Sequence, residues 1–421
     1  MSEKFERKNI YLLFDIKVFS MKEITFIKDY LSNMKDAQII IGNFLEDEEN
    51  NGIEYLNKKI DLSKFHKNKH EFKVFLRFIS KISQNHNRSK HFLLKVSYII
   101  KLLKKNMNQT FSNFEIFDIF ESNKQILLIL FDEKILYPDQ YISSLITNDK
   151  YKDRLYPQYF YPEFKSFYTK QLLDDLNPKV PEFSNESFDE FDMKRKNGEN
   201  DHHICQLIRN DSVAEFISYV NRANIPISEA KIVKSVFETN SFLLDKETSL
   251  IEYAAFFGSI QIFNYLMINN VELTSSLWLY AIHSNNPEII HLLEEKHVLL
   301  PKNGYFKECL KEAIKCHHND IVMYIQSNKM KTKNIIDYAF RYINYALFDD
   351  EMIDDIFDSY LSIFEFKTAN IKYPSPENTT VLSFLFKYLD LYIVEFLVKN
   401  KKVDLTYKIE YNDFIIKFFY F

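Results

Sequence analysis

The sequence predicts an all-α protein in which a helical N-terminal domain precedes a solenoid of repeated helix pairs. Apolar side chains recur at the three- and four-residue spacing of amphipathic helices along most of the chain, and one such pattern repeats from Asp201 onward. The chain has 5 glycines in 421 residues, far below the roughly 7% of average usage. Because sheet proteins depend on glycine-containing turns, this scarcity favours helices joined by short turns that carry Asn and Asp.

Composition and charge exclude several classes of protein. Apolar residues make up 46% of the chain, which excludes wholesale disorder, and the net charge of −5 offers no basic surface for nucleic acid or an anionic membrane. Three cysteines fit a reducing compartment better than a disulfide framework. Asp15 and Lys17 interrupt the apolar N-terminal run, and no stretch holds 18 uncharged apolar residues. We therefore expect no secretory signal and no membrane span, and a cytoplasmic location.

Residues 1–176 form the predicted helical N-terminal domain. Amphipathic segments of ordinary helix length follow one another there and are separated by polar breaks. These segments are Met21–Met34, His70–Ile82, His91–Leu103, Ser122–Leu136, Asp139–Ile146 and Glu163–Leu176. Residues 177–200 contain two prolines, one glycine and many charged residues, and we interpret them as a linker to a repeat domain at 201–421.

The clearest repeat unit is Ser249–Thr274, whose pattern predicts two helices and a turn. Gly258 ends the first helix, and Asn269 and Asn270, which tolerate a positive φ, follow the second. The apolar face of the first helix is Ile251, Ala254 and Ala255, and that of the second is Ile262, Phe263 and Leu266. One helix pair cannot bury these faces alone, so neighbouring units must bury them between each other.

The same frame recurs along the second half of the chain. Apolar residues lie 8, 9 and 12 positions after an anchor residue in the first helix. In chain order the anchors are Ile208 (a looser copy), Ala254, Ala281, Ala313, Ala339 (first helix only) and Leu385 (a looser copy). Anchor spacings of 46 residues at either end imply insertions in a repeat of about 30. We expect about five or six units, with a truncated last unit as one option.

This frame resembles the ankyrin repeat, which is a turn followed by two antiparallel helices in about 33 residues. Ser249 lies where that family has the Thr of its Thr-Pro-Leu-His start, Ile251 takes the place of the Leu, and Gly258 matches the glycine between the helices. Leu250 and Glu252 replace the Pro and the His, so the resemblance implies a degenerate array.

Three runs of sequence are similar to a divergent ankyrin-repeat family of parasitic protists. They are Ile204–Ser212, Leu250–Ser259 and Ser276–His291. In that family a helical N-terminal region of unknown function precedes the repeats, and the resemblance covers roughly residues 40–421. It implies the fold and a general binding role, and no enzymatic activity comes with it.

A histidine-cysteine run at the start of the repeats suggests an enzyme at first sight. Asp201-His202-His203-Ile204-Cys205 is similar to the Asp-His-His-Cys motif of palmitoyltransferases. Ile204 interrupts that motif, however, and no zinc-binding cysteine array surrounds it. Cys205 also occupies an apolar position of its repeat, where a small buried side chain is expected. We therefore predict no catalytic site.

A second group of cysteines and histidines suggests zinc. Cys309 and Cys316 are seven residues apart, and His317 and His318 follow directly. Structural zinc needs four ligands, commonly in pairs with closer spacing, and adjacent histidines at a helix end point in different directions. We therefore expect no metal, and the absence of a glycine-rich phosphate loop leads us to expect no cofactor.

The candidate binding residues lie one position before and two positions after each anchor. The ankyrin resemblance places these side chains on an exposed concave face. The predicted protein-binding residues are Tyr253, Phe256, Tyr280, His283, Glu312 and Lys315. Tyrosine suits such a surface because it offers a large contact area and a polar tip. Trp278, three positions before its anchor, is predicted to lie in the core.

The predicted function is a non-enzymatic protein-interaction scaffold. It binds a protein partner of unknown identity through the concave face and the turn tips of the repeats. The alternative is a two-part adaptor, in which the N-terminal helical region recruits an effector protein while the repeats select the target.

Overall fold

The computed structural model describes residues 21–47, 52–59, 68–85, 91–176, 187–301, 306–329, 335–349, 352, 410–411 and 414–415. Almost all secondary structure in these residues is helical, which confirms the all-α class. The predicted last repeat at Leu385, the first part of the predicted linker (177–186) and the N-terminal 20 residues lie outside the described residues. No helix in the described ranges combines the length and apolarity that crossing a bilayer requires.

Contacts divide the chain into two compact parts. The first comprises Met1–Asn33 and Phe348–Phe421. In it the structure describes the first half of α1 (Met21–Glu46) and two short antiparallel strands, β1 (Glu410–Tyr411) and β2 (Phe414–Ile415). The second part, Met34–Leu347, holds both the remaining N-terminal helices and the helix pairs that follow them.

The N-terminal helices of the second part match the amphipathic segments of the sequence. The segment predicted at His70–Ile82 forms α3, whose residues Phe72, Phe75 and Ile79 are fully buried. The helices after α1 are α2 (Gly52–Lys59), α3 (Lys69–Asn85), α4 (Phe92–Thr110), α5 (Asn113–Phe120), α6 (Lys124–Asp132), α7 (Gln140–Ile146), α8 (Asp149–Lys152), α9 (Tyr156–Tyr159), α10 (Tyr161–Phe164), η2 (Lys165–Phe167) and α11 (Lys170–Leu176).

Residues 188–197, inside the predicted linker, form helix α12 (Phe188–Asn197). The side chain of Ser187 caps its start, and Gly198 at a φ of 68° ends it. Arg195 is buried and pairs with Glu163 at 2.8 Å and with Asp192 at 2.7 Å. This part of the chain is therefore anchored to the N-terminal helices.

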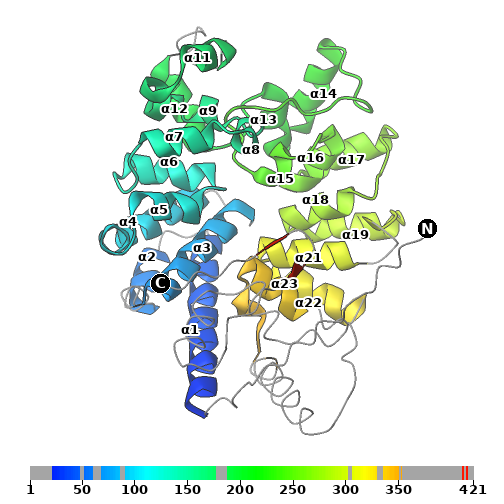
Figure 1. The fold of residues 1–421 in the computed structure, drawn as a ribbon. Helices are drawn as coiled ribbons and strands as arrows, with labels where there is room; N and C mark the ends of the chain where they lie inside the picture. Colours follow the sequence, from blue (N-terminus) through cyan, green and yellow to red (C-terminus); the bar gives the residue numbers. More distant parts are fainter. Residues whose placement is uncertain are drawn as a thin grey trace, which may run out of the picture. The chain divides into compact units, whose positions relative to one another are not determined.

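From residue 203 onward the described helices form pairs whose first helices follow one another in contact (Figure 1). Each of α13, α16, α18 and α21 contacts the next first helix, and the last contacts α23. The helices are α13 (His203–Arg209), α14 (Val213–Arg222), α15 (Ser241–Leu244), α16 (Leu250–Phe257), α17 (Ile260–Ile268), α18 (Leu277–Ser284), α19 (Pro287–Glu295), α21 (Lys307–Cys316), α22 (Asn319–Asn328), α23 (Ile335–Tyr342) and η4 (Tyr345–Leu347). The apolar residues at +8, +9 and +12 after Ala254, Ala281 and Ala313 are all buried.

A left-handed residue ends the first helix of every described unit. These residues are Asp211 (φ 49°), Gly258 (72°), Asn285 (52°), His317 (60°) and Ile343 (55°). After Gly258 the amide of Ser259 bonds the carbonyl of Ala254, and in the first unit the matching bond runs from Ser212 to Leu207. The structural counterpart of Ala254 is therefore Leu207, one residue before the Ile208 that the sequence pattern suggested.

The residue after each left-handed position links its unit to the preceding one. From the second helix pair onward, the side chain of this residue hydrogen-bonds a backbone carbonyl at the end of the first helix of the preceding pair. The pairs of this inter-unit ladder are Ser259 to Ile208 (2.6 Å), Asn286 to Gly258 (3.2 Å), His318 to His283 (3.3 Å) and Asn344 to Ile314 (2.9 Å). The ladder gives each of these carbonyls a hydrogen bond from the following helix pair.

Candidate functional site on the first helices

The six predicted binding residues lie together on three neighbouring first helices. Each helix contributes two of them three residues apart, a spacing that places both side chains on one side of a helix. Phe256 of α16 stacks on His283 of α18 with ring centroids 4.9 Å apart. His283 in turn contacts Glu312 of α21. We call the surface formed by these six residues the first-helix face.

The first-helix face is covered, contrary to the exposure that the sequence led us to expect. Tyr253 and Tyr280 are each 1% exposed, His283 is 2% exposed and Phe256 is 9% exposed. The side chains of Glu312 and Lys315 are 12% and 25% exposed. The expectation of exposure is wrong because another segment of the same chain lies on this face. A role of these residues in binding a partner stays a prediction.

The covering segment is the inter-repeat loop, residues 232–248, which connects the first and second units. Its ends meet, since the amide of Ile232 donates to the carbonyl of Thr248 over 2.7 Å. Phe242, on the short helix α15 within the loop, lies on the face. Its ring centroid is 4.2 Å from that of His283 and 4.9 Å from that of Tyr280. The insertion that the anchor spacing predicted therefore fills the surface beside it.

The other side of the inter-repeat loop is fixed to the N-terminal helices. The ammonium of Lys124 donates to the carbonyl of Glu238 over 3.1 Å, and the side-chain amide of Asn240 donates to the carbonyl of Gln84 over 3.1 Å. Burial lowers the pKa of Lys124 to about 7. An exposed ion pair between Arg154 and Asp245, at 2.7 Å, adds a further contact. The loop thus lies between two groups of helices.

The two tyrosines of the face use their hydroxyls inside the protein. The Tyr253 hydroxyl accepts a hydrogen bond from the guanidinium of Arg209 at 2.9 Å, and the Tyr280 hydroxyl lies 3.2 Å from the hydroxyl of Thr248. Burial raises the pKa of Tyr280 to about 12, although the contact with Thr248 opposes this shift. These polar tips are therefore occupied by partners from the same chain.

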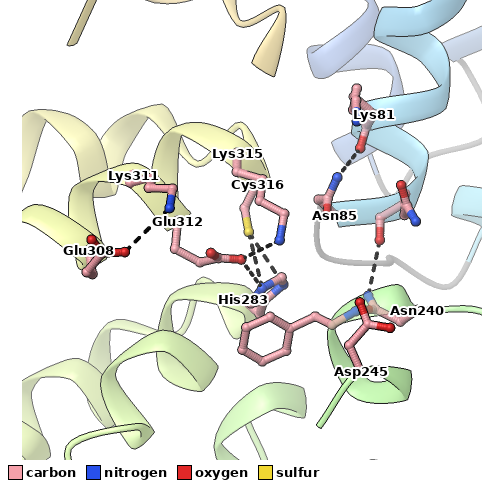
Figure 2. A network of polar contacts seen from close by, with 12 residues as sticks. Lys81, Asn85, Asn240, Asp245, His283, Glu308, Lys311, Glu312, Lys315 and Cys316 are labelled. Carbon is pink, nitrogen blue, oxygen red and sulfur yellow. Dashed lines mark hydrogen bonds and ion pairs between the residues drawn. The ribbon is translucent and has the colours of Figure 1, made fainter. Parts of the chain in front are cut away.

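A buried polar network occupies the end of the face nearest α21 (Figure 2). His283 Nε2 lies 2.8 Å from Glu312 Oε1, and Cys316 Sγ lies 3.4 Å from His283 Nδ1. A carboxylate only accepts hydrogen bonds, so Nε2 carries the imidazole proton and donates it to Glu312. Nδ1 is then the acceptor for the Cys316 thiol.

The charges in this network are arranged around Glu312. Burial works to raise the pKa of the Glu312 carboxyl, but the hydrogen bonds from His283 and Lys315 outweigh it and hold this pKa well below its usual range. Burial lowers the pKa of His283, so the imidazole is neutral. Lys315 lies 2.9 Å from Glu312 Oε1 and supplies the balancing positive charge.

The order thiol, imidazole, carboxylate resembles that of a nucleophile with its base and orienting acid. Here, however, Cys316 is fully buried, and burial raises its pKa well above the usual value. A nucleophilic cysteine needs a thiolate and access to substrate. In the described conformation the arrangement therefore favours a structural or ligand-holding role over nucleophilic chemistry.

The cysteines and histidines considered as zinc ligands in the sequence do not lie together in the structure. Cys316 lies with His283 and Glu312. The ring of His317 packs against Phe78, and His318 belongs to the inter-unit ladder. One signal in the sequence pointed to this cluster: Glu312 and Cys316 are four residues apart on one helix and therefore share a face. The contribution of His283 from another unit carries no such local signal.

Comparison with known proteins identifies a family match. A family model described as a domain of unknown function, DUF3447, matches residues 268–349, which include α18, α19, α21, α22, α23 and η4. The matched range carries His283, Glu312 and Cys316. No curated protein matches the chain. No solved structure matches it either.

Proposed function

We propose that the chain is a protein-interaction scaffold built from degenerate ankyrin-like repeats. The consecutive helix pairs, the left-handed residue between the helices of each pair and the inter-unit ladder support a repeat array of this kind. In this proposal the partner contacts the turn tips and the second helices, because the inter-repeat loop already occupies the first-helix face.

Exposed apolar side chains on the second helices and turns carry the proposal. Ile268, the last residue of α17, is 75% exposed, and Leu299, in the turn after α19, is 79% exposed. Ile268 ends the second helix of its pair and Leu299 follows the second helix of the next pair, so both belong to the same end of consecutive helix pairs. Met323 on α22 is 59% exposed. Exposed apolar side chains on consecutive helix pairs suit contact with a protein partner.

The test is co-purification with the full chain as bait, with bound proteins identified by mass spectrometry. The test variant is Ile268→Glu/Leu299→Glu, which places charge on the turn tips and leaves the core unchanged. The matched control is Met193→Glu, which changes a 58% exposed apolar residue of α12. The proposal expects the double variant to lose partners that the control keeps. Equal partner sets for both would contradict it.

The second candidate function is the two-part adaptor, and an aromatic patch on the N-terminal helices favours it. Phe114 and Tyr141 are 43% and 56% exposed, and their rings lie edge to face with centroids 5.2 Å apart. Tyr137, also 56% exposed, hydrogen-bonds through its backbone to Asn113 beside them. Exposed aromatic side chains are frequent anchors of protein interfaces. We infer that an effector protein would bind here.

The two candidates differ in what Phe114→Glu/Tyr141→Glu does in the same co-purification. An adaptor loses one class of partners with this variant and another class with the turn-tip variant. A scaffold loses partners with the turn-tip variant alone. Point substitutions are preferable to deletion of residues 1–176, because that deletion would also remove Lys124 and Gln84, which hold the inter-repeat loop.

A further inference from the structure

Three side chains that commonly bind metal ions meet at the buried network between α18 and α21. His283, in the last turn of α18, offers an imidazole nitrogen, while Glu312 and Cys316 offer an oxygen and a sulfur from successive turns of α21. These three donor atoms all lie within 4.8 Å of one another. We call this group the three-donor cluster; Figure 2 shows its side chains pointing toward one another.

We propose that the three-donor cluster is a binding site for a single divalent transition-metal ion, with Zn²⁺ as the preferred ion. Imidazole nitrogen, carboxylate oxygen and cysteine sulfur are the donors that Zn²⁺ takes in proteins. A set that includes sulfur disfavours Mg²⁺ and Ca²⁺, which prefer oxygen ligands. Water would complete the tetrahedral coordination.

Two of the three donor separations can be compared directly with those of a tetrahedral zinc site. Typical Zn–N, Zn–O and Zn–S bond lengths at the tetrahedral angle separate N from O by about 3.4 Å and N from S by about 3.5 Å. In the structure His283 Nε2 lies 2.8 Å from Glu312 Oε1 and 3.7 Å from Cys316 Sγ. Binding therefore requires that the carboxylate move away from the imidazole by about 0.6 Å, and side-chain rotations of Glu312 and Cys316 bring their oxygen and sulfur, which lie within 4.8 Å, around the ion.

The surroundings of His283 hold its ring in place. The ring lies against both Phe242 and Phe256, with centroids 4.2 Å and 4.9 Å away. The backbone carbonyl of His283 also accepts the ladder bond from His318. Contacts around a metal ligand support metal binding because they fix the orientation of the ligand side chain. The inter-repeat loop, which supplies Phe242, thus covers and orients the site.

Charge balance identifies Lys315 as the residue that opposes metal binding. When Zn²⁺ binds at Nε2, the Cys316 thiol releases its proton to the buffer, and the imidazole stays neutral because its proton passes from Nε2 to Nδ1. The ion then balances the Glu312 carboxylate and the new thiolate, so Lys315 loses its counter-charge. Lys246, which packs over the ring of Phe242, adds a second positive charge nearby. Lys315 is partly exposed and can turn toward water.

The test uses the reduced full chain, treated with a chelator and then titrated with Co²⁺ as a spectroscopic probe. The proposal expects one equivalent of Co²⁺ to bind with thiolate-to-cobalt charge-transfer absorption, and Zn²⁺ to displace it. Cys316→Ser should abolish that absorption. The matched control, Cys309→Ser, changes a buried cysteine of the same helix outside the three-donor cluster and should keep it. Absence of the absorption in the wild type, or its survival in Cys316→Ser, would overturn the proposal.

A second variant keeps the test decisive if Cys316→Ser does not fold. Lys315→Met retains all three donors and removes the charge that competes with the ion. The expected result is binding at least about tenfold tighter than in the wild type, because a unit charge beside a partly buried ion costs affinity. Unchanged or weaker binding by Lys315→Met would contradict the charge argument and the site with it.

Discussion

The ammonium of Lys124 donates a hydrogen bond to the backbone carbonyl of Glu238, 114 residues later, over 3.1 Å. This contact joins helix α6 to the inter-repeat loop. Lys124 is 1% exposed and lies over the rings of Tyr156 and Tyr159. Burial disfavours its charged form, which lowers its pKa from 10.5 to about 7. The stability of the fold should therefore depend on pH through this residue.

The first prediction concerns that dependence. Between pH 7 and pH 10.5 the unfolded chain binds a proton at Lys124 that the folded chain has lost, so the free energy of unfolding contributed by this residue rises with pH across the window. Urea denaturation at a series of pH values should show a shallower rise for Lys124→Met than for the wild type. Lys105→Met, which changes an exposed lysine of α4, is the control. Parallel curves for wild type and Lys124→Met would contradict the prediction.

The second prediction concerns the anchoring of α12. Arg195→Met leaves Glu163 buried without its cation and should lower the free energy of unfolding by about 3–5 kcal/mol. Lys196→Met, one residue along and 55% exposed, should cost less than about 1 kcal/mol. Equilibrium urea denaturation measures both. Similar losses for the two variants would show that α12 is not held by the buried ion pair.

The third prediction concerns the inter-unit ladder. Asn344 is fully buried and donates to the carbonyl of Ile314 and to the side chain of Asn319. Asn344→Ala removes both hydrogen bonds from a buried site and should cost about 1–3 kcal/mol in chemical denaturation, although the carbonyl of Ile314 still accepts from the amide of His317. Asn269→Ala removes an exposed side-chain bond to the carbonyl of Tyr265 and should cost clearly less. Equal losses would argue against a role for the ladder in joining units.

The fourth prediction concerns the left-handed turns. Gly258 has a φ of 72°, and an added Cβ would lie 3.3 Å from the side chain of Asn286. Gly258→Ala should therefore lower the free energy of unfolding by about 1–2 kcal/mol. Asn285 occupies the same position one unit later at a φ of 52°. Asn285→Gly relieves strain there and should leave the thermal midpoint unchanged or raised; a large decrease would contradict this account.

The fifth prediction concerns the covered face. Phe242→Ala removes the ring that packs on Tyr280 and His283 and should cost about 3–5 kcal/mol. Amide hydrogen exchange should increase in residues 232–248 and in α18, which the ring covers. Phe188→Ala, at a 44% exposed position of α12, should leave exchange in these segments unchanged. Protection of the loop equal to that of the wild type would show that Phe242 does not hold it on the face.

Local sequence patterns predicted the helices well because burial on one face of a helix leaves a periodic trace. The stripe Ile262, Phe263 and Leu266 is buried as expected. Gly258 and Asn270 adopt the left-handed conformation that their residue types suggested. In both cases the physical cause acts within a few residues, so the sequence alone carries it.

The exposure of the candidate site was predicted wrongly because it depends on a distant segment. The pattern around Tyr280 and His283 is that of a helix with a polar and aromatic side, and such a side is equally compatible with solvent and with a covering loop. The inter-repeat loop has no regular pattern of apolar residues, so the sequence did not indicate that it lies on the first-helix face. The contact between His283 and Cys316 was also not predictable from local patterns, because the two residues lie in different helix pairs.

The sequence by itself determined the helical class, the repeated helix pairs and the residue types at their turns, since spacing and backbone preference decide these locally. Only the tertiary structure decided that the inter-repeat loop covers the first-helix face and that the donor atoms of His283, Glu312 and Cys316 lie close together there. Those arrangements depend on contacts such as that between Asn240 and Gln84, 156 residues apart. Such a contact forms only when the packed helices bring both ends together.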